Sequence, residues 1–205
     1  MEFKKIQLNG FKSFAEKTNF LIEDGLTGIV GPNGCGKSNI VESLRWAMGE
    51  TSAKSMRGSG MEDVIFNGTS NKASKNIAEV SIVVDNASHE GPFQYKEIDQ
   101  IEIRRKIEKD KGSKFYINDK EVRARDAQMF FADLSTGAHS PSMISQGRIG
   151  ALVTAKPTDR RAILEEAANI SGLHVRRHEA ELRLNAAETN LKRADELRRQ
   201  QEKQL

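Results

Sequence analysis

The chain has 205 residues, of which 37% are hydrophobic and 30% charged, so it is long enough for one substantial domain with an extended, solvated part. Its net charge of +3 permits contact with nucleic acid without requiring it. An integral membrane protein and a disulfide scaffold are excluded, because no apolar run approaches the ~20 residues of a membrane span and Cys35 stands alone. Since the N-terminus also lacks the apolar core of a signal peptide, we expect a soluble, intracellular protein.

The first 25 residues predict two strands separated by a turn. Residues 3–8 alternate between apolar and charged or polar side chains, which indicates a half-buried strand. A turn rich in lysine and phenylalanine follows at residues 10–14, and Phe20 and Ile22 belong to a second strand. Asp24-Gly25 is typical of a hairpin turn leading into the next strand.

A phosphate-binding loop follows and organises the rest of the chain. The pattern G-x-x-x-x-G-K-[ST] is matched in full by Gly31, Pro32, Asn33, Gly34, Cys35, Gly36, Lys37 and Ser38. Residues 26–30 predict a buried strand before the loop, and residues 39–48 predict an amphipathic helix after it. This arrangement directs backbone N–H groups and a helix N-terminus at a polyphosphate. Lys37 would reach the β and γ oxygens and Ser38 would bind a magnesium ion, so we expect a nucleoside triphosphate to bind here.

The middle of the chain predicts a lobe of antiparallel strands. A polar loop at residues 49–61 leads to a short strand at residues 64–66. Residues 77–84 alternate strongly, the pattern returns from Ile101 to Ile107, and residues 115–122 form a hairpin around Asn-Asp-Lys. A helix follows at residues 125–134, where Ala127, Phe130, Phe131 and Leu134 have helical spacing.

The last third of the chain changes from a globular pattern to a long helix. Residues 143–150 form an apolar run interrupted by Ser-Gln-Gly, and a helix that Pro157 introduces is expected to stop near Ser171-Gly172. Residues 173–205 contain no proline, glycine or aromatic residue. One heptad frame has apolar residues at Ala180, Leu184, Ala187, Leu191, Ala194 and Leu205, although Arg198 and Gln201 break the frame near its end. This narrow stripe favours a coiled coil over a solvated surface helix, and the partner helix is not in this sequence.

Two short segments imitate parts of a catalytic site that the chain otherwise lacks. Ile82-Val83-Val84-Asp85 resembles the strand that carries a magnesium aspartate, but it belongs to the alternating antiparallel pattern and a turn follows it. Leu134-Ser135-Thr136-Gly137 resembles the signature loop of ABC-type ATPases. In that class the signature loop follows the segment with the glutamine, whereas here it precedes Gln146. We interpret both as chance matches, so the chain carries half of a hydrolytic site.

In combination, the motifs resemble one family, the bacterial SMC (structural maintenance of chromosomes) proteins, over the whole chain. The resemblance rests on Gly10–Phe14 (Gly-Phe-Lys-Ser-Phe), Gly31–Asn39, Met61–Gly68 (Met-Glu-Asp-Val-Ile-Phe-Asn-Gly), Ile144–Gly147 (Ile-Ser-Gln-Gly) and the exit into a coiled coil. It implies an α/β fold with a mixed sheet, the N-terminal lobe of an ABC-type P-loop ATPase head at residues 1–172, and the first segment of an outgoing coiled-coil arm at residues 173–205. The C-terminal lobe, with the remaining catalytic groups, would return along the partner helix.

The resemblance also implies roles for individual residues, with ATP and Mg²⁺ as cofactors. Asn39 would join the phosphate loop in holding the triphosphate, and Gln146 would meet the magnesium ion and the lytic water. Arg57 aligns with an arginine that approaches the nucleotide and couples hydrolysis to DNA; the alternative is an ordinary exposed loop arginine. The residues expected near the base and ribose are Lys12, Ser13 and Asp63.

The partners that the resemblance implies are a second SMC subunit, a kleisin, its winged-helix companion and double-stranded DNA. Two heads would engage around two ATP molecules and separate on hydrolysis. Candidate DNA contacts without sequence specificity are Lys54, Arg57, Lys111, Lys114, Lys120, Arg123 and Arg125. We interpret Arg104-Arg105-Lys106, on an alternating strand, as a solvated face. The expected location is the cytoplasm, in association with the nucleoid.

Three other classes of protein fit part of the pattern. A DNA double-strand-break repair ATPase shares the split head and the coiled coil. A transporter's nucleotide-binding domain would need an unsplit head and a membrane partner, and the heptad helix argues against it. The isolated chain could also be a binding module without activity of its own.

Overall fold

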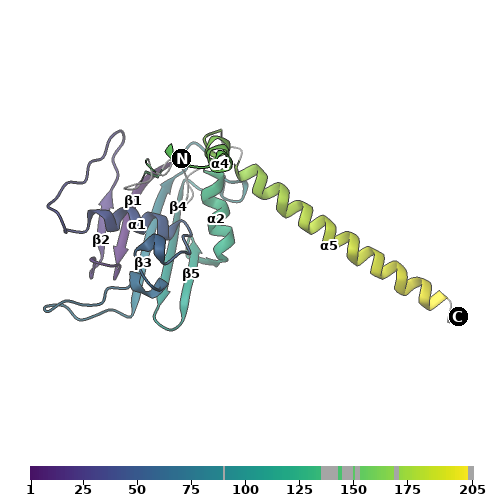
Figure 1. Ribbon diagram of the computed structural model, residues 1–205, viewed down its shortest axis with the longest axis horizontal. Helices are drawn as coiled ribbons and strands as arrows, with labels where there is room; N and C mark the ends of the chain where they lie inside the picture. The colour runs from purple at the N-terminus through teal and green to yellow at the C-terminus, as the bar shows by residue number, and fades with distance from the viewer. Residues whose placement is uncertain (90, 135–142, 145–149, 151–152, 169–170, 203–205) are drawn as a thin grey trace.

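The computed structural model describes residues 1–89, 91–134, 143–144, 150, 153–168 and 171–202. The elements follow in the order β1 (Glu2–Asn9), β2 (Thr18–Leu21), α1 (Lys37–Ala47), η1 (Lys54–Met56), η2 (Met61–Val64), β3 (Ile77–Asp85), η3 (Phe93–Tyr95), β4 (Gln100–Glu108), β5 (Gly112–Ile117), β6 (Lys120–Val122), α2 (Ala124–Asp133), α4 (Pro157–Ala167) and α5 (Ser171–Glu202). In Figure 1 a globular part contains the sheet, and α5 projects away from it as a single long helix.

The strands form one six-stranded sheet in the order β2-β1-β3-β4-β5-β6, and every pairing among the described strands is antiparallel. The alternation of apolar and polar residues sets the register of the strand pairs, since a shift of one strand by one residue would move each of its apolar side chains to the other face of the sheet. Ile82 of β3 therefore lies opposite Ile6 of β1 on one side and Ile103 of β4 on the other. The predicted antiparallel lobe is confirmed.

The apolar face of the sheet is covered by α1, which packs on β3 and β4, and by α2, which packs beside β5 (Figure 1). The two helices contribute Trp46, Phe130 and Phe131 to the same hydrophobic cluster as the strands. Trp46 is fully buried, and its ring lies 5.5 Å from that of Phe11, which follows β1. This packing holds the C-terminal end of the phosphate-loop helix against the turn at residues 10–14.

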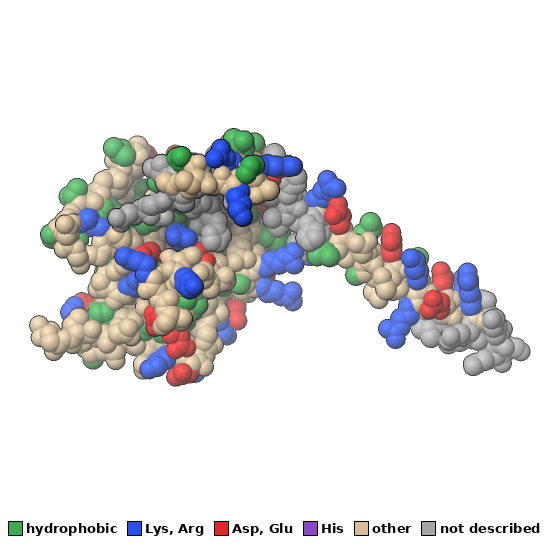
Figure 2. Space-filling view, viewed as in Figure 1, with side chains coloured by type: hydrophobic (Ala, Val, Ile, Leu, Met, Phe, Trp, Pro, Cys, Tyr) green, Lys and Arg blue, Asp and Glu red, His purple; other side chains and the backbone are tan. Residues whose placement is uncertain are grey.

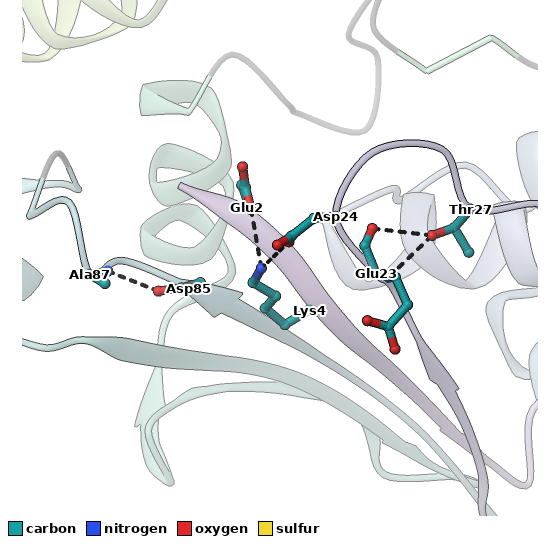
Figure 3. Close-up of polar contacts among 7 residues, drawn as sticks. All are labelled: Glu2, Lys4, Glu23, Asp24, Thr27, Asp85 and Ala87. Carbon is teal, nitrogen blue, oxygen red and sulfur yellow. Dashed lines mark hydrogen bonds and ion pairs between the residues drawn. The ribbon is translucent and has the colours of Figure 1, made fainter.

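The strand predicted at residues 26–30 is wrong. This segment has no regular structure, and Leu26 and Val30 are 99% and 94% exposed. A strand needs a neighbour for its backbone groups, and no described strand pairs with this segment. The hairpin predicted at Asp24-Gly25 is wrong for the same reason. Figure 3 shows how the chain bends there instead: Lys4 on β1 forms an ion pair with Asp24.

Two further boundaries differ from the predictions. The strand predicted at residues 64–66 is mostly absent: η2 occupies Met61–Val64, and Ile65 forms only a single bridge with Phe11. The helix predicted to stop near Ser171 ends at Ala167, and α5 begins at Ser171. The long helix itself is confirmed, and its heptad residues Leu184 and Leu191 are 61% and 69% exposed.

Arg105 does not lie on a solvated face, as the sequence suggested, but inside the core with 4% exposure. Its guanidinium donates to the carbonyls of Trp46 and Glu50, each at 2.7 Å, at the C-terminal end of α1. It also stacks on the Trp46 ring, 4.5 Å from the centroid. Burial lowers the pKa of Arg105 to about 10, so it stays charged at neutral pH and offsets the partial negative charge of the helix end.

Candidate nucleotide-binding site

The phosphate loop ends where α1 begins, as its sequence predicted. Gly36 is the residue before the helix and has a φ of 96°, in the left-handed region that favours glycine. A Cβ at Gly36 would lie 2.5 Å from the Ser13 hydroxyl oxygen. Glycine is therefore required at this position for two reasons, the backbone conformation and the close approach of the turn at residues 10–14. The residues of this loop fit a polyphosphate, because the loop ends at the N-terminus of α1, where helices offer backbone N–H groups and a partial positive charge to anions.

Lys37 is folded back on the loop that precedes it. Its ammonium group donates to the carbonyls of Gly31 and Pro32, both at 2.6 Å, and lies 3.8 Å from the Cys35 sulfur. The Ser38 side chain is exposed. A phosphate that bound here would therefore replace two carbonyls as the hydrogen-bond acceptors of Lys37.

Asn39 connects three of the predicted site residues. Its Nδ2 donates to the Ser13 hydroxyl at 2.9 Å, and its Oδ1 accepts from Arg57 Nη2 at 2.9 Å. Ser13, Asn39 and Arg57 are far apart in the sequence, and the structure brings them together beside the phosphate loop.

A fourth predicted residue, Lys12, joins this cluster through a residue that the sequence reasoning missed. The Lys12 ammonium donates to the Met56 carbonyl at 2.5 Å and forms an ion pair with Glu42 of α1. Glu42, 9% exposed, also forms an ion pair with Arg57. The available signal was its spacing, one helical turn after Ser38 on the same helix face.

The Asp63 carboxylate is turned toward its own loop. It accepts hydrogen bonds from the Gly60 N–H at 2.9 Å, from the Ser59 hydroxyl at 2.9 Å and from the Ser59 N–H at 2.6 Å. These hydrogen bonds lower the pKa of Asp63. Asp63 thus holds the segment between Arg57 and η2, and its role near a base or ribose stays a prediction.

A cavity of about 340 Å³ lies between the phosphate-loop helix and the Arg57 loop. It is lined by Ser38, Val41, Glu42, Arg45, Ser55, Arg57 and Ile144. The hydroxyl that the sequence assigns to magnesium therefore faces the same space as the Glu42 and Arg57 side chains. Figure 2 shows Lys and Arg side chains, with Asp and Glu side chains among them, in the middle of the globular part.

Other predicted positions lie apart from this cluster or outside the described residues. Asp85 stands at the end of β3 opposite Glu2, and its carboxylate accepts from the Ala87 N–H at 2.9 Å (Figure 3). The turn predicted after Asp85 is confirmed, and the residue belongs to a strand end, not to the cavity. Gln146 and residues 135–137 lie outside the described residues.

The candidate DNA contacts fall on two parts of the fold. Lys54 and Arg57 lie in the loop after α1, and the other five lie in or next to the β4–β6 edge and the start of α2. Lys111 pairs with Glu108 at 2.6 Å, and Lys114 pairs with Glu121 at 3.0 Å. These pairs are exposed, so DNA phosphates could compete with the carboxylates.

Comparison with known proteins agrees with this fold. The family model described as "RecF/RecN/SMC N terminal domain" matches residues 2–150. A protein of Cereibacter sphaeroides named "Chromosome partition protein Smc" is 57% identical over 96% of this chain, which spans 17% of that relative. No helix in the described part of the chain is long and apolar enough to cross a membrane.

Two solved structures share the fold. One, described as "Structural biochemistry of ATP-driven dimerization and DNA stimulated activation of SMC ATPases", is 30% identical with a TM-score of 0.72, over 82% of this chain and 99% of that one. The other is an Smc head domain with an extended coiled coil, bound to the C-terminal domain of ScpA, from Pyrococcus furiosus. It is 31% identical with a TM-score of 0.76, over 95% of this chain and 48% of that one. The predicted ABC-type head fold with a coiled-coil helix is thus confirmed, and the chain belongs to the SMC family.

Proposed function

We propose that this chain is the ATP-binding N-terminal lobe of an SMC chromosome-partition ATPase. Residues 1–172 would form the lobe and residues 173–205 the start of the outgoing arm. The observation that carries the proposal is the complete phosphate loop at the start of α1, with Ser13, Asn39 and Arg57 hydrogen-bonded into one cluster beside it. The names of the relatives favour chromosome partition over the alternative of double-strand-break repair.

The residues of the loop indicate how ATP would bind. Lys37 would leave the carbonyls of Gly31 and Pro32 and donate to the β and γ phosphates. The Ser38 hydroxyl and Gln146 would hold Mg²⁺, which neutralises charge on the phosphates when bound. Gln146 would also orient the attacking water. Arg57 stands where it can approach the nucleotide across the cavity that Ser38 lines.

Hydrolysis would need a second segment, because the described residues hold no magnesium aspartate near the loop. The exposed apolar segment from Leu26 to Val30 supports this, since it has the composition of a buried strand but pairs with none of the described strands. The C-terminal lobe of the same gene product would supply that strand, together with the signature loop. The heptad stripe of α5 would receive the returning helix.

The proposed function also implies a larger assembly. A second SMC subunit would complete the two ATP sites, and a kleisin with its winged-helix companion would bind the heads, as the ScpA complex does for its own Smc head. DNA would bind without sequence specificity through exposed basic side chains, with strong salt dependence. The protein would act in the cytoplasm, on the nucleoid.

ATP hydrolysis by this chain alone, and then mixed with the C-terminal part of its gene product, tests the proposal. We expect no turnover alone and DNA-stimulated turnover in the mixture. Lys37→Ala should abolish that turnover, whereas Lys75→Ala, at an exposed lysine away from the loop, should not. Robust hydrolysis by the isolated chain would contradict the split site.

A further inference from the structure

Two cationic residues of the site, Lys12 and Arg57, share an uncommon backbone conformation. Their φ angles are 46° and 54°, in the left-handed region that costs free energy for residues with a Cβ. Such conformations persist only where surrounding contacts hold them. Both side chains end on the same carboxylate, that of Glu42, one on each oxygen.

Glu42 is well placed to impose this arrangement. It lies on α1, whose start is fixed by the phosphate loop and whose far end is held by Arg105. It is 9% exposed, so its charge is poorly solvated and depends on the two cations. Arg57, by contrast, is 58% exposed at its side chain and belongs to a loop, so its direction is set by Glu42 and by the 2.9 Å bond to Asn39.

We propose that Glu42 is a positioning residue for hydrolysis, which aims Arg57 at the space beside Ser38. This inference rests on the proposed ATPase function. Glu42 exerts two opposite effects at the same site. It holds Arg57 in the direction of the cavity, which favours turnover, and its negative charge lies one helical turn from Ser38, which opposes the binding of an anionic nucleotide.

The two effects predict that KM and kcat change in different ways in the full-length gene product. Glu42→Gln keeps the size of the side chain and removes its charge. We expect the DNA-stimulated kcat to fall roughly tenfold, because Arg57 loses its ion pair, while the KM for ATP stays the same or falls about two- to threefold. Glu42→Asp keeps the charge but withdraws it by one methylene, so its loss of kcat should be smaller.

Glu50→Gln is a matched control, because Glu50 is also buried and paired with an arginine, Arg45, but at the far end of α1. It should lower thermal stability without the fall in kcat, measured on the folded fraction. A double-mutant cycle with Arg57→Ala adds a second test: if Glu42 acts through Arg57, Glu42→Gln should reduce kcat less in the Arg57→Ala background.

Each outcome decides the question. The proposal would be overturned if Glu42→Gln had the same kinetics as Glu50→Gln, or if it raised KM with a normal kcat. It would also be overturned if the effects of Glu42→Gln and Arg57→Ala on kcat were additive. If Glu42→Gln does not fold, a Glu42→Asp protein with the kcat of the unaltered protein would overturn the proposal equally. Failure of the proposed function looks different, because Lys37→Ala would then leave the turnover of the full-length protein unchanged.

Discussion

At the residue scale, the contacts of Arg105 show how a charge can stabilise a core. Its side chain is buried, but every contact that the structure records for the guanidinium is favourable: two carbonyls, the Ser113 hydroxyl at 3.0 Å, and the faces of Trp46 and Phe115. The Trp46 carbonyl, which also accepts from the Gly49 N–H at 3.1 Å, lies in the last turn of α1, and the Glu50 carbonyl lies just beyond it, so Arg105 ties the end of α1 to the sheet. Removing it would leave these acceptors buried without that donor.

Arg105→Leu should therefore destabilise the chain by about 3 kcal/mol or more. Arg104→Leu is the matched control on the neighbouring residue. Arg104 pairs with Asp119, which is 78% exposed, so its loss should cost less than about 1 kcal/mol. Urea denaturation followed by circular dichroism measures both. Equal midpoints for the two variants would contradict the capping role of Arg105.

Asp63 predicts a dependence of stability on pH. Hydrogen bonds from Gly60 and Ser59 lower its pKa below the ordinary 3.8, so the folded state binds this proton more weakly than the unfolded state does. The stabilisation is complete above the unfolded pKa and is lost as the pH falls through the folded pKa. Asp63→Asn, which cannot titrate, should lose less stability on acidification below about pH 4 than the unaltered chain.

A set of urea midpoints between pH 7 and pH 3 measures this effect. Ser59→Ala is the control, because it removes one hydroxyl donor to the carboxylate and leaves Asp63 itself in place. The pKa of Asp63, followed by NMR of its carboxyl carbon, should rise in Ser59→Ala. An unchanged pKa would show that the Ser59 hydroxyl does not contribute.

At the element scale, α5 is a long helix with little to hold it. Its leucines at positions 184 and 191 are more than half exposed, and in Figure 1 only its first turns lie near the globular part. A helix whose apolar stripe is unpaired gains little from burial, so most of its stability must come from a partner helix. The stripe is narrow, as expected of a coiled-coil seam.

Leu184→Glu and Leu182→Glu form a matched pair on this helix. Leu184 lies on the heptad seam and Leu182 does not, although both are more than half exposed in this chain. Alone, each variant should change the free energy of unfolding by less than about 0.5 kcal/mol. In the full-length protein only Leu184→Glu should lower the thermal midpoint of the coiled coil. Equal effects of the two substitutions would place the seam elsewhere.

At the scale of the whole molecule, the sheet is covered on one face and open at the segment before the phosphate loop. Leu26 and Val30 are almost completely exposed, next to the loop that carries the proposed chemistry. Figure 2 shows hydrophobic side chains standing out on the left, where this segment lies in Figure 1. Exposed apolar stretches of this kind mark interaction sites. We therefore expect a partner segment to cover this stretch when the head assembles.

Val30→Asp tests this link between assembly and the site. Because Val30 is 94% exposed, the free energy of unfolding of the variant should lie within about 0.5 kcal/mol of that of the unaltered chain. It should nevertheless bind the C-terminal part of the gene product at least tenfold more weakly, measured by titration calorimetry. Leu182→Asp, on the arm and off the heptad seam, should bind normally. Normal binding by Val30→Asp would show that this segment is not the contact.

The sequence predicted most of the sheet, because much of β3 and β4 alternates between apolar and polar residues and both strands have partners in the chain. It failed at Leu26–Val30, where the pattern of a strand is present but none of the strands that the structure describes pairs with it. Arg105 was predicted to be solvated because of its charge. It lies two residues from both Ile103 and Ile107 on the same strand, so its side chain is on the same inward face as theirs. Glu42 was missed because its spacing from Ser38 is a weak signal, and its ion pairs with Lys12 and Arg57 join segments that are distant in the sequence.

The stacking of Arg105 on Trp46 has an optical consequence. Trp46 is the only tryptophan of this chain, it lies near the end of the phosphate-loop helix, and a cation stands 4.5 Å from its ring. Indole emission responds to nearby charge, so any shift of α1 against β4 will change its wavelength or intensity. The chain thus contains an intrinsic fluorophore that can report, without a label, when a ligand at one end of this helix moves the other.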